Sequence, residues 1–217
     1  MKPVRLLIAD DHDIIREGIR ALLAVKPWTI CAETGNGREA VALARQHRPD
    51  VVVLDFSMPG LNGVDATRQI LKALPKTEIL ILTMHDSDQL ARECMAAGAH
   101  GFLLKTDVKG QLVPALEALL EHRPYFTPRV SALLLDEFLH PQPPAARRAR
   151  DRTQLTPRER EIVQLVAEGL TSKAVAERLN ISVKTVDAHR VNILRKLRLH
   201  SVSELVRYAI RNQIIQA

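Results

Sequence analysis

The first half of the chain alternates short apolar runs with amphipathic stretches. The apolar runs are rich in Val, Ile and Leu and predict β-strands at residues 4–9, 29–32, 51–54, 78–82 and 101–104. The stretches that follow them have helical spacing and end in Gly, Pro or polar clusters, which predicts helices at residues 12–25, 36–47, 64–74, 86–97 and 108–121. The pattern is therefore a series of β–α units.

This alternation predicts an α/β fold with a doubly wound, flavodoxin-like parallel sheet over residues 1–122. Parallel strands need crossover connections, which are right-handed and cover both faces of the sheet with helices. Ligands of such folds bind at the carboxyl ends of the strands. Functional residues are therefore expected directly after the apolar runs.

Residues 123–153 break the pattern and predict a linker. They contain Pro124, Pro128, a run of prolines and glutamine at residues 141–144, and a group of arginines after it. Proline stiffens such a segment and arginine keeps it solvated. The apolar residues 130–139 are a candidate helix that packs on either domain, so the linker is expected to be partly helical.

Residues 154–217 predict a second, all-α domain. Thr156, Pro157 and Glu159 form a strong helix start, with a Thr cap, Pro at the first position and Glu at the capping-box position. Ser201 and Glu204 repeat the capping-box spacing. The apolar pattern then fits helices at residues 157–168, 172–179, 183–197 and 202–213.

The length of 217 residues suggests one or two domains, and a composition of 46% hydrophobic and 26% charged residues is neither that of a disordered nor that of a fibrous chain. No apolar run reaches the roughly 18 residues of a membrane span, and no secretory signal precedes the first strand. A cytoplasmic location without membrane association is expected. Cys31 and Cys94 stand alone in apolar segments and are expected to be small core residues.

The charge is unevenly distributed between the two halves. Residues 1–125 carry 15 Lys and Arg against 16 Asp and Glu, whereas residues 126–217 carry 16 against 9. The net charges are therefore −1 and +7. A basic excess confined to one half indicates an anionic partner, with nucleic acid the first candidate and an anionic membrane surface the second. The 3% aromatic content argues against stacking of single-stranded bases.

Five polar residues follow strands of the first domain: Asp10, Asp11, Asp55, Thr83 and Lys105. In a doubly wound sheet these positions converge on one crevice. Crowded carboxylates repel each other unless a hard cation such as Mg²⁺ lies among them. One carboxylate could then attack a phosphoryl group, while the cation, the hydroxyl and the ammonium stabilise its oxygens. Each residue alone fits a helix cap or a solvated loop, but the set favours phosphoryl chemistry.

Residues 3–121 resemble a response-regulator receiver domain. The matching motifs are Ile8-Ala9-Asp10-Asp11-His12, Leu54-Asp55-Phe56-Ser57-Met58-Pro59 with Gly63, and the later Thr83 and Lys105. The resemblance implies that Asp55 is the phosphoacceptor and that Asp10 and Asp11, with Asp55, hold Mg²⁺. It also implies that Thr83 and Lys105 sense the phosphoryl group and that Phe102 is the rotating aromatic switch. On the residues alone, an ordinary core aromatic at the end of a strand is the favoured interpretation of Phe102.

Two positions leave details of this site open. Thr106 follows Lys105 where many receivers have proline, so the isomer of the Lys105–Thr106 peptide bond is undecided. Ser57 lies two residues after Asp55, where the family tunes how long the phosphoryl group survives.

A helix-turn-helix is the clearest feature of the second domain. Residues 171–179 and 183–197 flank a short turn in which Asn180 suits a left-handed conformation and Ser182 can cap the second helix. Val186, Ile193 and Leu197 lie on the inward face of that helix. The outward face mixes small, apolar and charged residues, which suits a major groove: Lys184, Asp187, Ala188, Val191 and Arg195.

Residues 155–213 resemble the LuxR/FixJ/NarL-type helix-turn-helix. The matching motifs are Leu155 to Glu161, Ala167-Glu168-Gly169, Lys173 with Ala176 to Leu179, and Lys184 to Arg190. The resemblance implies that Lys184, Thr185 and Arg190 contact phosphates or the groove, and that Asp187, Ala188 and Val191 lie where sequence is read. His189 is expected to pack within the domain. Glu159 and Glu161 have capping and dipole roles rather than forming a catalytic pair.

Together these features predict a two-component response regulator rather than an enzyme. A sensor histidine kinase would phosphorylate Asp55, and the phosphorylated chain would bind double-stranded promoter DNA as a homodimer, with RNA polymerase a further candidate partner. An aspartyl-phosphate phosphatase usually needs a second acid at the position of Ser57. A DNA-binding regulator that works without phosphorylation is the alternative, although the acidic set is complete.

Overall fold

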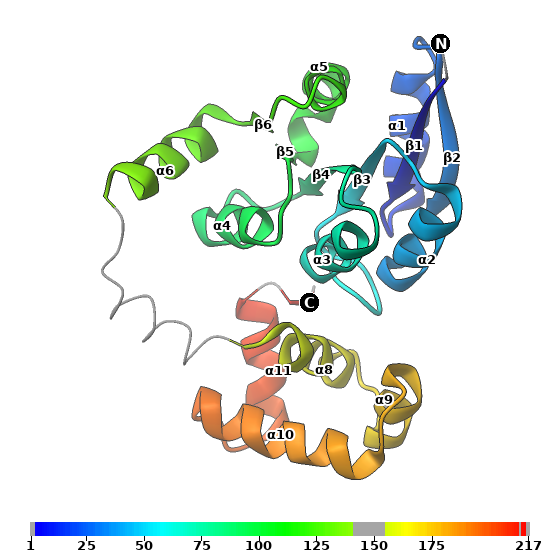
Figure 1. Ribbon diagram of the computed structural model, residues 1–217. Coiled ribbons are helices and arrows are strands. Elements are labelled where there is room, and N and C mark those ends of the chain that lie inside the picture. Colours follow the sequence, from blue (N-terminus) through cyan, green and yellow to red (C-terminus); the bar gives the residue numbers. More distant parts are fainter. Residues whose placement is uncertain (1–2, 141–154, 213, 216–217) are drawn as a thin grey trace. The chain divides into compact units, whose positions relative to one another are not determined.

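The computed structural model describes residues 3–140, 155–212 and 214–215, and the chain forms two compact units, 1–136 and 137–217 (Figure 1). The first unit is a parallel sheet with strand order β2-β1-β3-β4-β5-β6. Its strands are β1 (Val4–Ala9), β2 (Trp28–Thr34), β3 (Val51–Asp55), β4 (Glu78–Thr83), β5 (Gly101–Leu104) and β6 (Tyr125–Phe126). This arrangement confirms the doubly wound, flavodoxin-like sheet and adds a sixth strand to it.

Helices cover both faces of the sheet, because alternate residues of each strand point to opposite sides. The intervening helices are α1 (Asp13–Leu23), α2 (Gly37–His47), α3 (Gly63–Ala73), α4 (Asp88–Ala96), the short 3-10 helix η1 (Lys105–Asp107) and α5 (Val108–Leu120). In β1, Leu7 and Ala9 belong to the apolar cluster that includes residues of α2, α3 and α4, whereas Leu6 and Ile8 belong to the cluster that includes residues of α1 and α5. Cys94 is buried and Cys31 packs against the same cluster at intermediate exposure.

The segment that begins the expected linker belongs in part to the first unit. Tyr125 and Phe126 form β6, which pairs in parallel with Gly101 and Phe102 of β5. Helix α6 (Pro128–Leu139) follows, and its Val130 is 2% exposed within the core under α4. The first compact unit thus extends to residue 136, past the expected boundary at residue 122. The physical reason is that the backbone of β6 forms hydrogen bonds with β5 and that α6 buries the apolar side chain of Val130.

Most of the remaining predicted linker, including the run at residues 141–144 and the arginines after it, lies outside the described residues. The second unit consists of α8 (Pro157–Ala167), α9 (Ser172–Leu179), α10 (Val183–Leu197) and α11 (Val202–Arg211). These bounds agree with the four predicted helices to within two residues. The helices pack around one apolar cluster that includes Ile162, Val175, Val186, Ile193 and Leu205.

The helix ends of the second unit follow the polar signals in the sequence. Thr156 and Glu159 form the complete capping box of α8. Ser182 caps α10 by accepting from the backbone N–H of Thr185, and Asn180 is left-handed at φ 52°. Ser201 caps α11 by accepting from Glu204 N–H, but the Glu204 carboxylate accepts from His200 N–H rather than from Ser201. The predicted second capping box is thus half formed.

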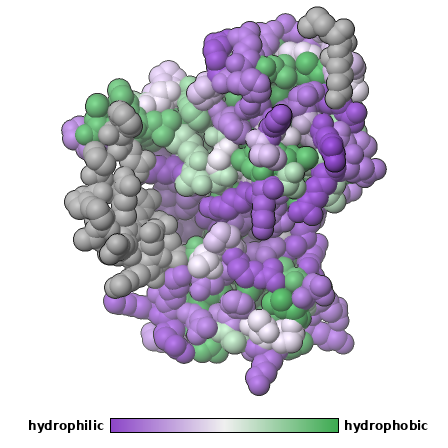
Figure 2. Space-filling model, viewed as in Figure 1, coloured by the Kyte–Doolittle hydropathy of each residue, from purple (hydrophilic) through white to green (hydrophobic). Residues whose placement is uncertain are grey.

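Hydrophilic residues cover most of each unit on the face shown in Figure 2. Within the part of the chain that the structure describes, no helix combines the length and apolar character needed to cross a bilayer.

Candidate functional site

The predicted carboxylates meet at the carboxyl edge of the sheet. Asp10 follows β1 and Asp55 is the last residue of β3. These strands are neighbours at the point where the strand order reverses, which is where doubly wound folds bind ligands. Asp10 and Asp55 are 0% and 1% exposed, whereas the side chain of Asp11 is 28% exposed. Two acids are therefore removed from water and one remains accessible.

Lys105 supplies the buried positive charge of this site. Its Nζ lies 2.8 Å from Asp10 Oδ2 and 3.1 Å from Asp55 Oδ2, and its side chain is 2% exposed. Lys105 begins η1 directly after β5, so its side chain reaches past the end of β4 to β3. The peptide bond to Thr106, which the sequence left open, is trans. One ammonium thus bridges two buried carboxylates.

The charge balance at the site remains negative despite Lys105. Burial raises the pKa of Asp55 from its ordinary value to about 7, and the Asp10 carboxylate adds to this effect, while Lys105 opposes it. A buried acid with so high a pKa is held in its charged form at a cost. The pocket is therefore suited to receive an additional cation.

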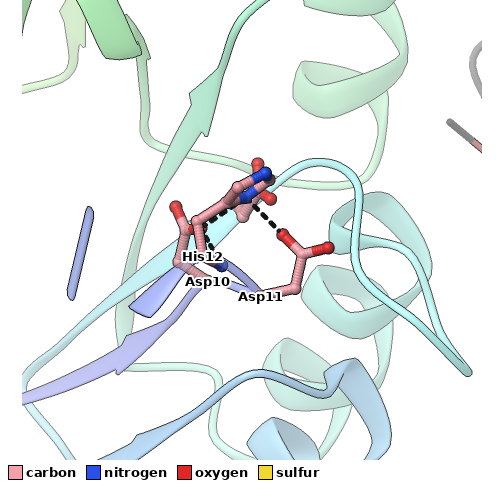
Figure 3. Close-up of side chains that lie close together, drawn as sticks. Asp10, Asp11 and His12 are labelled. Carbon is pink, nitrogen blue, oxygen red and sulfur yellow. Dashed lines mark hydrogen bonds and ion pairs between the residues drawn. The ribbon is translucent and has the colours of Figure 1, made fainter. Parts of the chain in front are cut away.

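His12 joins the acidic group, which the sequence reasoning did not foresee (Figure 3). Its Nδ1 lies 2.7 Å from Asp11 Oδ1 and 3.3 Å from Asp10 Oδ1, and its backbone N–H donates to Asp10 Oδ1 over 2.9 Å. Ligand atoms of Asp10, Asp11, His12 and Asp55 lie within 4.8 Å of one another. The carboxylate oxygens of this set are the ligands that Mg²⁺ prefers. The sequence does contain a sign of this arrangement, since His12 directly follows Asp10 and Asp11.

Thr83 and Phe102 lie on the strands beside this pocket. Thr83 ends β4 at 1% exposure, and its hydroxyl accepts from His85 N–H over 3.1 Å. Phe102 lies on β5, is 1% exposed, and belongs to the core cluster that also contains Leu90 and Val130. The Phe102 side chain thus packs inward in this structure. Ser57, two residues after Asp55, is 8% exposed.

The second candidate site is the outer face of α10. Val186 and Ile193 are buried against the other helices, as the sequence predicted. The predicted outward residues are exposed: Lys184, Asp187, Ala188, Val191 and Arg195. Val191 is notable because this apolar residue is 56% exposed. Thr185 is also exposed, and its hydroxyl shares a 2.8 Å hydrogen bond with the hydroxyl of the capping residue Ser182.

Asp187 and Arg190 have a common partner that the sequence did not suggest. The hydroxyl of Ser172, the first residue of α9, donates to Asp187 Oδ1 over 2.8 Å. The same hydroxyl accepts from Nη1 of Arg190, a half-buried residue, over 2.7 Å. Ser172 lies 15 residues before Asp187 in the chain. No local pattern in the sequence could have identified this contact.

Glu159 has the expected capping role, whereas Glu161 pairs with an arginine of its own helix. Glu159 completes the capping box of α8 and its carboxylate lies 2.7 Å from Lys196 Nζ. Glu161 lies 2.7 Å from Nη1 of Arg158, whose second terminal nitrogen donates to the Leu179 carbonyl. Glu159 therefore links α8 to α10, and Arg158, which pairs with Glu161, links α8 to the end of α9. His189 has intermediate exposure on α10.

Two protein families match this chain, one over the region of the acidic pocket and one over the region of α10. The response regulator receiver domain matches residues 6–117. The luxR family of bacterial regulatory proteins matches residues 153–209. The receiver match alone spans more than half of the chain, and the acidic pocket lies within it.

Relatives and solved structures match nearly the whole chain. Oxygen regulatory protein NreC of Staphylococcus carnosus is 37% identical over 215 residues, 98% of this chain and 99% of the relative. Transcriptional regulatory protein LiaR of Bacillus subtilis is 35% identical over 213 residues, with 98% and 99% coverage. The Salmonella typhimurium response regulator RcsB has a TM-score of 0.57 at 26% identity, with coverage of 96% of this chain and 98% of that one.

The fold, the acidic pocket and these matches define the class of protein. The chain belongs to the response regulators, with an N-terminal receiver domain. Within that class, it is a DNA-binding transcriptional regulator with a luxR-family helix-turn-helix.

Proposed function

We propose that Asp55 accepts a phosphoryl group from a sensor histidine kinase and that this event controls promoter binding through α10. The observation that carries the proposal is the ion pair between Lys105 Nζ and Asp55 Oδ2, buried at the carboxyl end of β3. In the transfer, a carboxylate oxygen of Asp55 bonds to phosphorus. The bond from phosphorus to the kinase histidine breaks, and the histidine nitrogen keeps the electron pair.

Asp10, Asp11 and Asp55 would hold Mg²⁺ in this proposal, and the clustering of their ligand atoms supports it. When bound, the cation neutralises charge on the phosphoryl oxygens. Lys105 supplies a second positive charge to the same oxygens. Since Lys105 already contacts Asp10 and Asp55, it needs little rearrangement to do so.

Thr83, Lys105 and Phe102 would sense the new group. The Thr83 hydroxyl, now bonded to His85 N–H, would turn toward a phosphoryl oxygen. Movement of β4 would then free space for the side chain of Phe102, which is buried on the neighbouring strand β5. The protein exists as an equilibrium of two states, and phosphorylation biases it toward the DNA-competent one.

In the DNA-binding unit, α10 would enter the major groove. Lys184, Thr185 and Arg190 would contact phosphates or the groove wall, and Ala188 and Val191 would face the base edges. The exposure of Val191 supports this orientation, because an apolar side chain can contact a thymine methyl group. Exposed Ala188 leaves room for close approach to the bases.

We further propose that the phosphorylated chain binds as a homodimer and that the protein is a stoichiometric phosphoacceptor rather than an enzyme. RcsB, which shares 26% identity at a TM-score of 0.57 over 95% of this chain, has been solved as a DNA complex. RcsB dimers have also been solved on DNA. A promoter-binding regulator works where the chromosome is, so we propose a cytoplasmic location.

The test is phosphorylation of the full chain by a small phosphodonor with Mg²⁺, followed by intact mass measurement and DNA footprinting. We expect one phosphoryl adduct per chain, none on Asp55→Asn, and tighter promoter binding of the modified wild type. Asp13→Asn is the matched control, since this acid lies near the pocket but its side chain is 85% exposed.

Two results would contradict this proposal. Rapid multiple turnover of the phosphodonor would indicate a phosphatase. Promoter binding of the wild type that is identical with and without the phosphodonor, and without an adduct, would indicate a regulator independent of phosphorylation.

A further inference from the structure

One hydroxyl joins the start of α9 to the outer face of α10. The Ser172 hydroxyl has a single proton, which it donates to Asp187 Oδ1 over 2.8 Å. A lone pair of the same oxygen accepts from Nη1 of Arg190 over 2.7 Å. Ser172 thus bridges an anionic and a cationic side chain that belong to another helix.

The two charged partners lie on one side of α10. Asp187 and Arg190 are three residues apart, a spacing that places helical side chains next to each other. Asp187 is exposed and Arg190 is half-buried. Both bonds to Ser172 involve an ionised group, so they are stronger than hydrogen bonds between neutral groups. They restrict a guanidinium that would otherwise move among many rotamers.

The direction of the bonds gives Asp187 a role through Ser172. Because the hydroxyl proton points to the Asp187 carboxylate, the rotation of the Ser172 hydroxyl is fixed with its lone pairs turned away from Asp187, where one accepts from Arg190. Arg190 uses one terminal nitrogen for this bond, and a guanidinium carries five N–H donors in all. The remaining donors are held in a fixed plane, which suits bidentate binding of a phosphate group.

An acid on a DNA-facing helix repels the DNA phosphates, so it weakens binding unless it has a compensating role. We propose that Ser172 and Asp187 are positioning residues of the DNA interface, which hold the Arg190 guanidinium ready for a phosphodiester of the DNA backbone. This inference rests on the proposed role of α10 in DNA binding. It assigns Asp187 to the support of a phosphate contact rather than to direct reading of a base.

The experiment uses the full chain, treated with a phosphodonor, and measures affinity for a footprinted promoter duplex and for a scrambled duplex over a series of salt concentrations. Ser172→Ala and Asp187→Ala should each weaken both duplexes alike, by about three- to tenfold. Their salt dependence should become shallower by up to about one unit, toward that of Arg190→Ala. Base preferences should stay intact.

The double variant and a conservative variant make the inference sharper. Ser172→Ala with Asp187→Ala should be no weaker than Ser172→Ala alone, because both changes interrupt the same path to Arg190. Ser172→Thr keeps the hydroxyl and should retain wild-type affinity. Ser203→Ala on α11 is the matched control and should leave binding unchanged. Thermal unfolding should show that every variant is folded at the temperature of the binding assay.

Two results would overturn the inference. In the first, Asp187→Ala relaxes preference at one base pair and leaves affinity for the scrambled duplex and the salt dependence as they were. In the second, the effects of Ser172→Ala and Asp187→Ala simply add. If wild-type protein bound neither duplex, the proposed DNA-binding role of α10 would fail instead, so the two failures are distinguishable.

Discussion

The acidic pocket of the receiver and the outer face of α10 both work through charge, but they hold it in opposite ways. In the pocket, the side chains of Asp10, Asp55 and Lys105 are at most 2% exposed. On α10, Lys184 and Asp187 are exposed to water. Buried charges are part of the folding energetics, whereas solvated charges act mainly on a ligand. Substitutions in the acidic pocket should therefore change mainly the free energy of unfolding, whereas substitutions on α10 should change mainly DNA binding.

The largest expected effect is the loss of the buried cation. Lys105→Ala leaves Asp10 and Asp55 without their shared counter-charge, so the free energy of unfolding should fall by about 3–5 kcal/mol. Urea denaturation at pH 8 with a chelator present measures it. Lys109→Ala, an exposed lysine of α5, should change the same quantity by no more than about 0.5 kcal/mol. Equal effects of the two variants would remove the contrast between buried and solvated charge.

Asp55→Asn should act in the opposite direction. At pH 8 the wild-type carboxylate is charged against burial and the repulsion of Asp10, which together raise its pKa to about 7. Without metal, the neutral amide should increase the free energy of unfolding by about 1–4 kcal/mol. The same denaturation assay measures this change, and Asp13→Asn is the exposed control. A loss of stability would mean that the ion pair with Lys105 outweighs burial.

The raised pKa of Asp55 predicts that the free energy of unfolding of the metal-free protein depends on pH. The folded chain keeps the Asp55 proton up to about pH 7, whereas the unfolded chain releases it near the ordinary value of 3.8. The folded state therefore binds more protons between these values. This contribution to stability is complete below about pH 4 and is lost as the pH rises through about 7. Wild type should lose stability relative to Asp55→Asn from pH 5 to pH 8, and parallel profiles would contradict the raised pKa.

The smallest expected effect lies on α10. Lys184→Ala removes a solvated charge, so the free energy of unfolding should stay within about 0.5 kcal/mol of wild type. Binding to specific and scrambled DNA should weaken equally, with a salt dependence shallower by about one unit. Binding isotherms at several salt concentrations measure both. Lys72→Ala on α3, also an exposed lysine, should leave DNA binding unchanged. A larger change in the free energy of unfolding of Lys184→Ala would show that the solvated charges of α10 also contribute to folding.

Much of the receiver could be predicted from its sequence, because burial on both faces of the sheet imposes a strong local pattern. The run at residues 51–54 predicted β3, which ends at Asp55. Since parallel strands end at the same edge, the sequence also predicted that Asp10, Asp55 and Lys105 converge, and their 2.8 and 3.1 Å contacts confirm it. Here position along the chain determines position in space.

The features that could not be predicted depend on partners far away in the chain. Strand β6 has only two residues, too few for an alternating pattern, and it exists because Gly101 and Phe102 offer a free edge to pair with. The contact from Ser172 to Asp187 likewise crosses between two helices. By contrast, the caps by Thr156 and Ser182 were predictable, since each cap bonds within three residues of itself.

Strand β6 and the first turn of α6 also determine where the receiver can be cut. A fragment that ends at residue 122 would lack β6 and leave β5 as an edge strand with open backbone N–H and C=O groups. It would also lack Val130, which is buried in the same core cluster as Phe102. Open strand edges pair with those of other molecules and promote aggregation. Self-association of so short a fragment would therefore report the missing strand, whereas a fragment ending at residue 136 keeps β6 paired with β5 and presents only the two-residue β6 at this edge.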